Sequence, residues 1–88
     1  MLGPMITFYA DAEVSTVRGT LAALDLNVSI EDAEGIFDGY PTAIDIYTTR
    51  TVAEVTALVL PLLGAAGIDA ALDDELERRA LKVDAAVA

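Results

Sequence analysis

The side chains available for chemistry in this 88-residue chain are carboxylates, tyrosines and serines, because histidine and cysteine are both absent. Histidine is the usual general base near neutral pH and the commonest metal ligand, and cysteine provides the thiolate nucleophile. Ser15 and Ser29 have no histidine or lysine at a spacing that would activate them. We therefore expect no catalytic residues, no metal site and no cofactor, and a protein that is not an enzyme.

Segment 31–40 contains four acidic residues and a turn-forming glycine. The acidic residues are Glu31, Asp32, Glu34 and Asp38. Calcium binds several oxygens on a tight turn, which Gly35 would supply, but the spacing differs from the twelve-residue EF-hand loop. We interpret the segment as a solvated acidic hairpin, with a calcium site as the alternative.

The charge balance limits the partners. Five basic residues stand against 15 acidic ones, which gives a formal net charge of −10. Such a surface repels phosphate backbones and anionic lipid headgroups, so we expect neither nucleic acid nor membrane as a partner. Two interpretations of the acidity remain open: a composition shaped by a GC-rich or salt-adapted genome, and an acidic face that docks on a basic site.

Length and cysteine usage define the class of protein. Eighty-eight residues predict one domain over 1–88, and a chain without cysteine has no disulfides to stabilise it. No stretch reaches the roughly 20 apolar residues of a membrane span, and the first residues do not form a secretion signal. We expect a cytoplasmic protein.

The chain repeats its own pattern at an offset of 38 residues. The matching pairs include Ile6 and Ile44, Tyr9 and Tyr47, and Val17 and Val55. In the first half, alternation predicts strands over residues 5–10 and 28–32. The helix between them is expected to start at Asp11 as N-cap, to end near Asn27, and to bury an apolar stripe of Val14, Val17, Leu21 and Leu24.

The second half predicts the same three elements. Strands are expected over residues 42–49 and 68–72. The helix between them begins at a capping box formed by Thr51 and Glu54, and Pro61 predicts a kink or break near Leu60.

A strand, a helix and a strand repeated in order resemble the ferredoxin-like βαββαβ plait. This α+β fold would have a four-stranded antiparallel sheet with two helices on one face, formed by a core at residues 5–72. Residues 73–88 are expected to form a C-terminal helix with Glu75–Arg79 and Asp74–Arg78 ion pairs. The alternative extends the sheet through Arg79, Leu81 and Val83.

In that plait, the sheet face away from the helices is open. Tyr9 and Tyr47 are expected to be neighbours there, flanked by Thr7, Asp45, Thr49, Glu31 and Asp69. The position resembles that of the stacking aromatics in RNA-recognition domains, but acidic neighbours replace the basic ones that RNA requires. We interpret this face either as a tyrosine pair that covers the sheet or as a surface that binds a second subunit or a partner.

A second resemblance covers about a third of the chain. The stretch ITFYADAEVSTVRGTLAALDLNVSIED is similar to the first half of ACT-type regulatory domains, with an acid at the turn from strand to helix. The resemblance implies an amino-acid-binding domain with Asp11, Ala12 and Glu13 at the ligand site. ACT-type domains usually carry Pro-Gly after the acid, where this chain has Ala12 and Glu13.

Together these features predict a small, acidic, non-enzymatic protein-interaction module. We expect an adaptor, inhibitor or oligomerisation domain, of the kind that serves as a phage or actinobacterial accessory protein. Its partner would be a protein with a basic surface, or a second copy in a homodimer. An ACT-like ligand-binding regulatory domain is the alternative.

Overall fold

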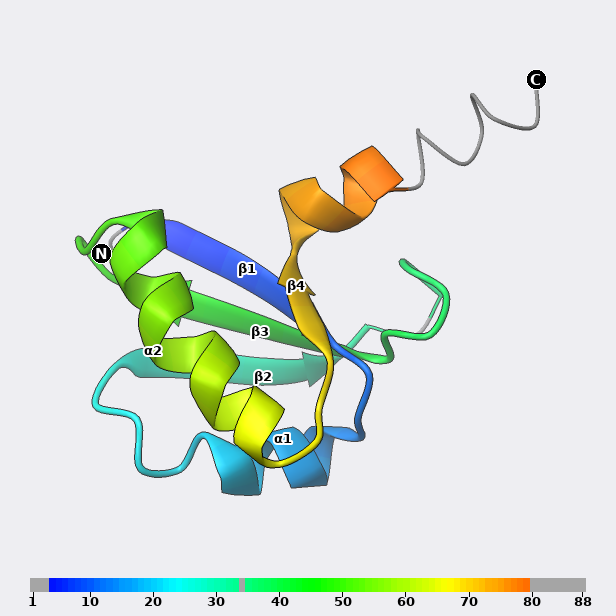
Figure 1. Cartoon of the computed structure of the whole chain (residues 1–88), viewed down its shortest axis with the longest axis horizontal. Coiled ribbons are helices and arrows are strands. Elements are labelled where there is room, and N and C mark those ends of the chain that lie inside the picture. The colour runs from blue at the N-terminus through cyan, green and yellow to red at the C-terminus, as the bar shows by residue number, and fades with distance from the viewer. Residues whose placement is uncertain (1–3, 34, 80–88) are drawn as a thin grey trace.

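The computed structural model describes residues 4–33 and 35–79, which form an α+β fold with a four-stranded antiparallel sheet (Figure 1). The elements are β1 (Met5–Ala10), α1 (Val14–Thr20), β2 (Asn27–Asp32), β3 (Thr42–Tyr47), α2 (Val52–Ala65) and β4 (Ala70–Leu72). A further helical segment covers residues 73–79. The strand order is β2-β3-β1-β4, so β1 and β3 are central, as expected. This arrangement is compatible with the ferredoxin-like plait.

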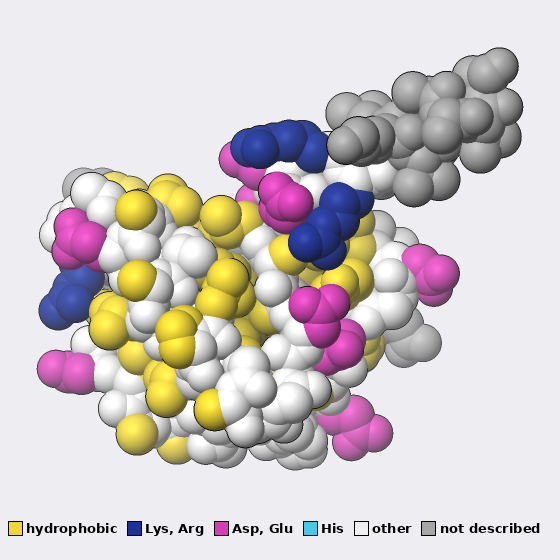
Figure 2. All heavy atoms as spheres, in the orientation of Figure 1, with side chains coloured by type: hydrophobic (Ala, Val, Ile, Leu, Met, Phe, Trp, Pro, Cys, Tyr) yellow, Lys and Arg dark blue, Asp and Glu magenta, His cyan; other side chains and the backbone are white. Residues whose placement is uncertain are grey.

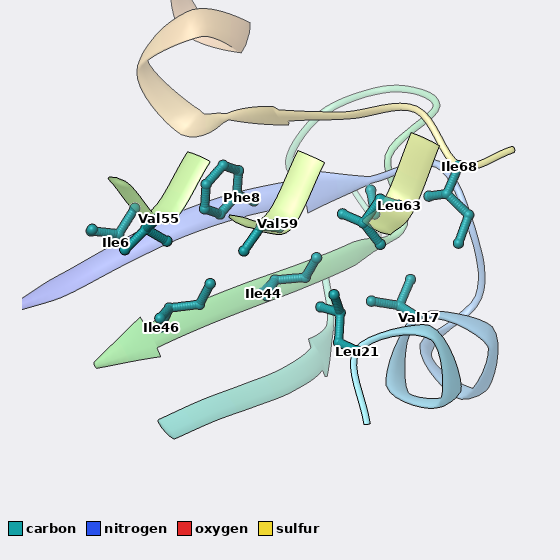
Figure 3. Close-up of a cluster of buried hydrophobic side chains, with 11 residues drawn as sticks. Ile6, Phe8, Val17, Leu21, Ile44, Ile46, Val55, Val59, Leu63 and Ile68 are labelled. Carbon is teal, nitrogen blue, oxygen red and sulfur yellow. The ribbon is translucent and has the colours of Figure 1, made fainter. Parts of the chain in front are cut away.

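One apolar cluster joins the sheet to α1 and α2, which lie on the same face of it (Figure 3). The sheet contributes Ile6, Phe8, Ala10, Ile44 and Ile46, and the helices contribute Val17, Val55, Val59 and Leu63. Each large side chain in this cluster stabilises the fold by about 1.5–3 kcal/mol when fully buried. The alternation of buried and half-exposed residues along β1 and β3 confirms that strands form there. Two strands are shorter than expected: β3 ends at Tyr47 instead of residue 49, and β4 begins at Ala70 instead of residue 68.

Helix α1 differs from the prediction at both ends. Its N-cap is Glu13 instead of Asp11, and the helix ends at Thr20. Asp11 is unavailable as a cap because its carboxylate accepts a hydrogen bond from the backbone of Asp69. Gly19 weakens the last turn, and the chain continues in turns that still bring Leu21 into the core.

Helix α2 begins as predicted, with the Thr51 side chain accepting from the Glu54 amide at 3.1 Å. Of the kink or break predicted near Leu60, the break is wrong, because the helix continues to Ala65. Proline removes the hydrogen bond to the carbonyl four residues earlier, that of Ala57. Both residues lie on the exposed side of α2, where water can satisfy that carbonyl.

The chain leaves the sheet after Leu72. Residues 73–79 are helical, so the alternative in which Arg79 extends the sheet is wrong; Leu81 and Val83 lie outside the described residues. The expected pair of Glu75 with Arg79 is confirmed at 3.4 Å, whereas Arg78 approaches Glu75 at 4.0 Å instead of Asp74.

Candidate functional site

The centre of the sheet face away from α1 and α2 is marked by Thr7 and Asp45. These two residues are 38 positions apart and also lie directly opposite each other in the β1–β3 pairing. The Thr7 hydroxyl donates a hydrogen bond of 2.8 Å to Asp45 Oδ1. The two half-repeats are therefore arranged around this pair in a pseudo-two-fold manner.

Tyr9 and Tyr47 are not neighbours, and that prediction is wrong. Tyr9 lies opposite Ala43, and Tyr47 lies opposite Met5. Because β1 and β3 run antiparallel, equivalent residues of the two repeats are displaced in opposite directions from the Thr7–Asp45 pair. The two tyrosines are four residues apart along β3, about 13 Å at the usual rise of a strand. The sheet face thus has a Tyr9 half and a Tyr47 half.

Other parts of the chain cover the Tyr9 half. The Phe37 ring packs edge-on against Tyr9, with ring centroids 4.9 Å apart and planes at 70°. Ala71, opposite Tyr9 in β4, is buried, and so is Leu76 of the 73–79 helix. Partial burial raises the pKa of Tyr9, and the negative charges of Asp73, Asp45 and Glu77 raise it further. Tyr9 is therefore a neutral, packed side chain.

A polar network ties this cover together. The Tyr40 hydroxyl donates to Asp69 Oδ2 at 2.6 Å and accepts from Arg79 at 3.5 Å. The hydrogen bond to Asp69 raises the pKa of Tyr40, with burial and the charge of Asp69 adding to it and Arg79 opposing it. Asp69 thus binds the loop before β3 instead of flanking Tyr47.

Sequence reasoning missed the covering role of Phe37 and Tyr40. The signal was present, because two of the chain's five aromatic residues fall in a segment interpreted as a solvated hairpin. Glu31 is exposed in β2 and lies opposite Ala43, toward the Tyr9 half. Glu34, the third acid of that segment, lies outside the described residues.

The Tyr47 half is open by comparison. Within residues 4–33 and 35–79, Tyr47 makes no ring contact and its hydroxyl makes no hydrogen bond. Its register partners are Met5, which is 53% exposed, and Asn27, which is also exposed. Thr49 is exposed beyond the end of β3. This half therefore places an aromatic and a thioether beside the central, polar Thr7–Asp45 pair.

The turn at Asp11, Ala12 and Glu13 is largely engaged in internal contacts. The Asp11 amide donates to the Asp69 carbonyl at 2.9 Å, and Asp11 Oδ1 accepts from the Asp69 amide at 2.8 Å. The Ala12 carbonyl accepts from the Thr42 hydroxyl. Glu13 remains exposed beside a hollow of about 400 Å³, which is also lined by Val14, Asp32, Pro41 and Thr42.

A second apolar surface covers the outer side of α2, where hydrophobic side chains gather in Figure 2. Val52, Leu58 and Leu62 are exposed by 49%, 39% and 38%. Glu54 is the one ionisable residue of this 14-residue helix. This outer side of α2 is therefore an alternative to the Tyr47 half as the binding site for an apolar partner.

In the part of the chain that the structure describes, no group of three or more acidic side chains is placed to hold a metal ion. None of the helices found there is long and apolar enough to cross a bilayer. No protein-family model, curated protein or solved structure matches the chain.

Proposed function

We propose that this protein is a non-enzymatic interaction module that binds a partner protein through the Tyr47 half of its sheet face. The observation that carries the proposal is the register of β1 and β3, which places Tyr47 beside the exposed Met5. Tyrosine and methionine are enriched at protein interfaces, and tyrosine is frequent among the residues that dominate binding energy. The net charge of −10 favours a partner with a basic surface.

We further propose that the fold is the ferredoxin-like plait. Support comes from the βαββαβ element order, the central position of β1 and β3, and the packing of both α1 and α2 on one face. A plait leaves one sheet face without helices of its own. In this chain, half of that face is covered by the loop before β3 and by residues 73–79, which leaves the other half for a partner or for a second copy in a homodimer.

The test is affinity capture from the native host with matched lysine variants, quantified by mass spectrometry. Tyr47→Lys places a positive charge on the proposed surface, and Leu58→Lys places the same charge on the outer side of α2. Thr16→Lys, on the exposed side of α1, controls for net charge. We expect Tyr47→Lys to lose a basic partner that the other two variants retain. Loss with Leu58→Lys and retention with Tyr47→Lys would overturn the proposal in favour of the α2 surface.

A second proposal retains the ACT-like function, with a small ligand in the hollow beside Glu13. The exposed Glu13 carboxylate favours a cationic group such as an amine. A thermal-shift screen against amino acids tests it, because a ligand at 100 times its dissociation constant stabilises the fold by about 2.7 kcal/mol. A shift that Glu13→Gln removes would support this function, and no shift across the set would reject it.

A further inference from the structure

Strand β2 forms one edge of the sheet. Within residues 4–33 and 35–79, the strand order β2-β3-β1-β4 places it beside β3 alone, and Figure 1 shows it as the outermost strand on that side. The Ala33 amide donates to the Pro41 carbonyl on the β3 side, and backbone groups alternate in direction along a strand. The backbone groups of odd-numbered residues in β2 therefore face β3, whereas the amides and carbonyls of Val28 and Ile30 point outward.

The outer side of β2 is only weakly blocked. Arg18 of α1 donates to the Ile30 carbonyl at 3.4 Å, which is a long hydrogen bond from an exposed side chain. A carbonyl has two lone pairs, so it can accept a second hydrogen bond from another strand. The sequence of β2 contains no proline and no lysine, the residues that commonly protect an exposed edge, and its two acids stand at its last two positions. The edge is therefore a template for a further strand.

The apolar side chains of β2 are incompletely covered. Val28 and Ile30 pack against the core cluster on the helix side of the sheet, yet both remain partly exposed. Their register partners in β3, Ile46 and Ile44, have an exposed fraction of 0%. A strand added beside β2 would cover the remaining apolar surface of Val28 and Ile30, as β2 itself does for β3.

The sequence of β2 is complementary to itself when a second copy runs antiparallel to it. With Ser29 opposite Ser29 of the partner subunit, Val28 lies opposite the partner's Ile30, and Asn27 lies opposite the partner's Glu31. Two β-branched pairs then form on the helix side, and on the other side each carboxylate faces an amide that can donate to it. Sliding one strand by two residues in either direction separates Asn27 from the partner's Glu31. The residues of β2 therefore favour a second copy of this chain, in the register centred on Ser29.

We propose that the protein forms a homodimer through β2, in which two four-stranded sheets join into one. The outward amides and carbonyls of Val28 and Ile30 pair with those of the partner subunit, around a two-fold axis at Ser29. This axis is perpendicular to the sheet, so the Tyr47 halves of both copies lie on the same side and stay open. The proposal goes beyond the Tyr47 surface, since it uses the backbone edge of the sheet instead of its face.

Disulfide trapping tests this register directly, because the chain has no cysteine of its own. Residues that face each other between the hydrogen-bonded pairs of antiparallel strands have Cα atoms about 4.5 Å apart, within the range of a disulfide. Ser29→Cys should therefore form a cross-linked dimer with oxidised glutathione, measured by non-reducing electrophoresis. Asn27→Cys is the matched control, because it is more exposed on the same face of β2 but lies more than about 13 Å from its own copy. We expect at least tenfold more cross-linking in Ser29→Cys, and equal cross-linking would overturn the proposal.

Sedimentation equilibrium tests the dimer without introduced cysteines, in about 0.5 M NaCl so that the net charge is largely screened. Ser29→Asp places two carboxylates opposite each other and should weaken dimerisation at least tenfold. Ala53→Asp, at an exposed position of α2, adds the same charge away from β2 and should leave the dimer unchanged. Circular dichroism checks that each variant is folded.

Tyr47→Lys separates this dimer from binding at the Tyr47 half, and we expect it to dimerise as the unaltered protein does. A dimer that Tyr47→Lys abolishes and Ser29→Asp retains would contradict the β2 interface. An unaltered protein that stays monomeric up to millimolar concentration would overturn the dimer itself, while leaving the proposed binding of a partner at the Tyr47 half intact.

Discussion

Thr42 is the buried polar side chain of the core in the described part of the chain, and its hydroxyl donates to the Ala12 carbonyl. This bond holds the first residue of β3 against the turn between β1 and α1. Thr42→Val keeps the shape of the side chain but leaves the carbonyl without its partner. We expect a loss of about 1–3 kcal/mol in the free energy of unfolding, measured by urea denaturation.

Thr20→Val is the matched control, because the Thr20 hydroxyl donates to the Thr16 carbonyl at an exposed position. Its effect should stay within about 0.5 kcal/mol. Similar losses for the two variants would mean that the Thr42 bond contributes nothing specific.

Tyr40 makes the cover over the Tyr9 half sensitive to alkaline pH. The pKa of Tyr40 is raised in the folded state, chiefly by its hydrogen bond to Asp69. A raised pKa means that its contribution to stability is complete below the unfolded value of about 10 and is lost as the pH rises through the folded value. We expect stability to fall above pH of about 10, and to fall less steeply in Tyr40→Phe.

The measurement is thermal unfolding across pH, together with tyrosinate absorbance to follow ionisation. Tyr40→Phe lacks both the raised pKa and the bond to Asp69, so it should be less stable than the unaltered protein below that pH. Identical pH profiles for the two proteins would contradict the assigned hydrogen bond.

At this scale, the sequence placed Thr7, Asp45 and Tyr47 correctly on the face away from α1 and α2, because strand alternation depends only on local pattern. It did not predict that Tyr9 would be covered. That outcome depends on where the loop carrying Phe37 and Tyr40 folds, and single-sequence periodicity holds no information about such a long-range contact.

Among the elements, α2 departs most from ordinary helix chemistry, because it contains Pro61 in its interior. Pro61→Ala restores an amide that can donate to the Ala57 carbonyl. It also increases the conformational entropy of the unfolded chain, which partly offsets this gain. We expect the variant to be more stable by about 1–2 kcal/mol in urea denaturation. A destabilised variant would show that the proline shapes the packing of Val59 and Leu63 instead of merely being tolerated.

The elements themselves were largely predictable. The strands and the Thr51 cap follow from alternation and from a short-range hydrogen bond, and both are found. Helix α1 is shorter than its apolar stripe. Leu21 and Leu24 lie after the end of the helix, and they still contact the core. An apolar stripe in the sequence indicates which side chains are buried, but it does not show whether their backbone is helical or irregular.

For the whole molecule, the 38-residue repeat gives the architecture its symmetry, and the segments outside the repeat break that symmetry. The loop before β3 and residues 73–79 cover the face around Tyr9, while the equivalent region around Tyr47 has no such cover in the described ranges. The proposed partner therefore occupies the position that the chain's own segments occupy on the other half.

Oxidation of Met5 by hydrogen peroxide, followed by mass spectrometry, tests this account most directly. Met5 is 53% exposed and lies beside Tyr47, so it should be oxidised readily in the protein alone. The experiment is repeated on the complex with the partner identified by affinity capture, with free methionine as an internal reference. We predict that the oxidation of Met5 is several-fold slower in this complex. An unchanged rate of Met5 oxidation in the complex would contradict binding at the Tyr47 half.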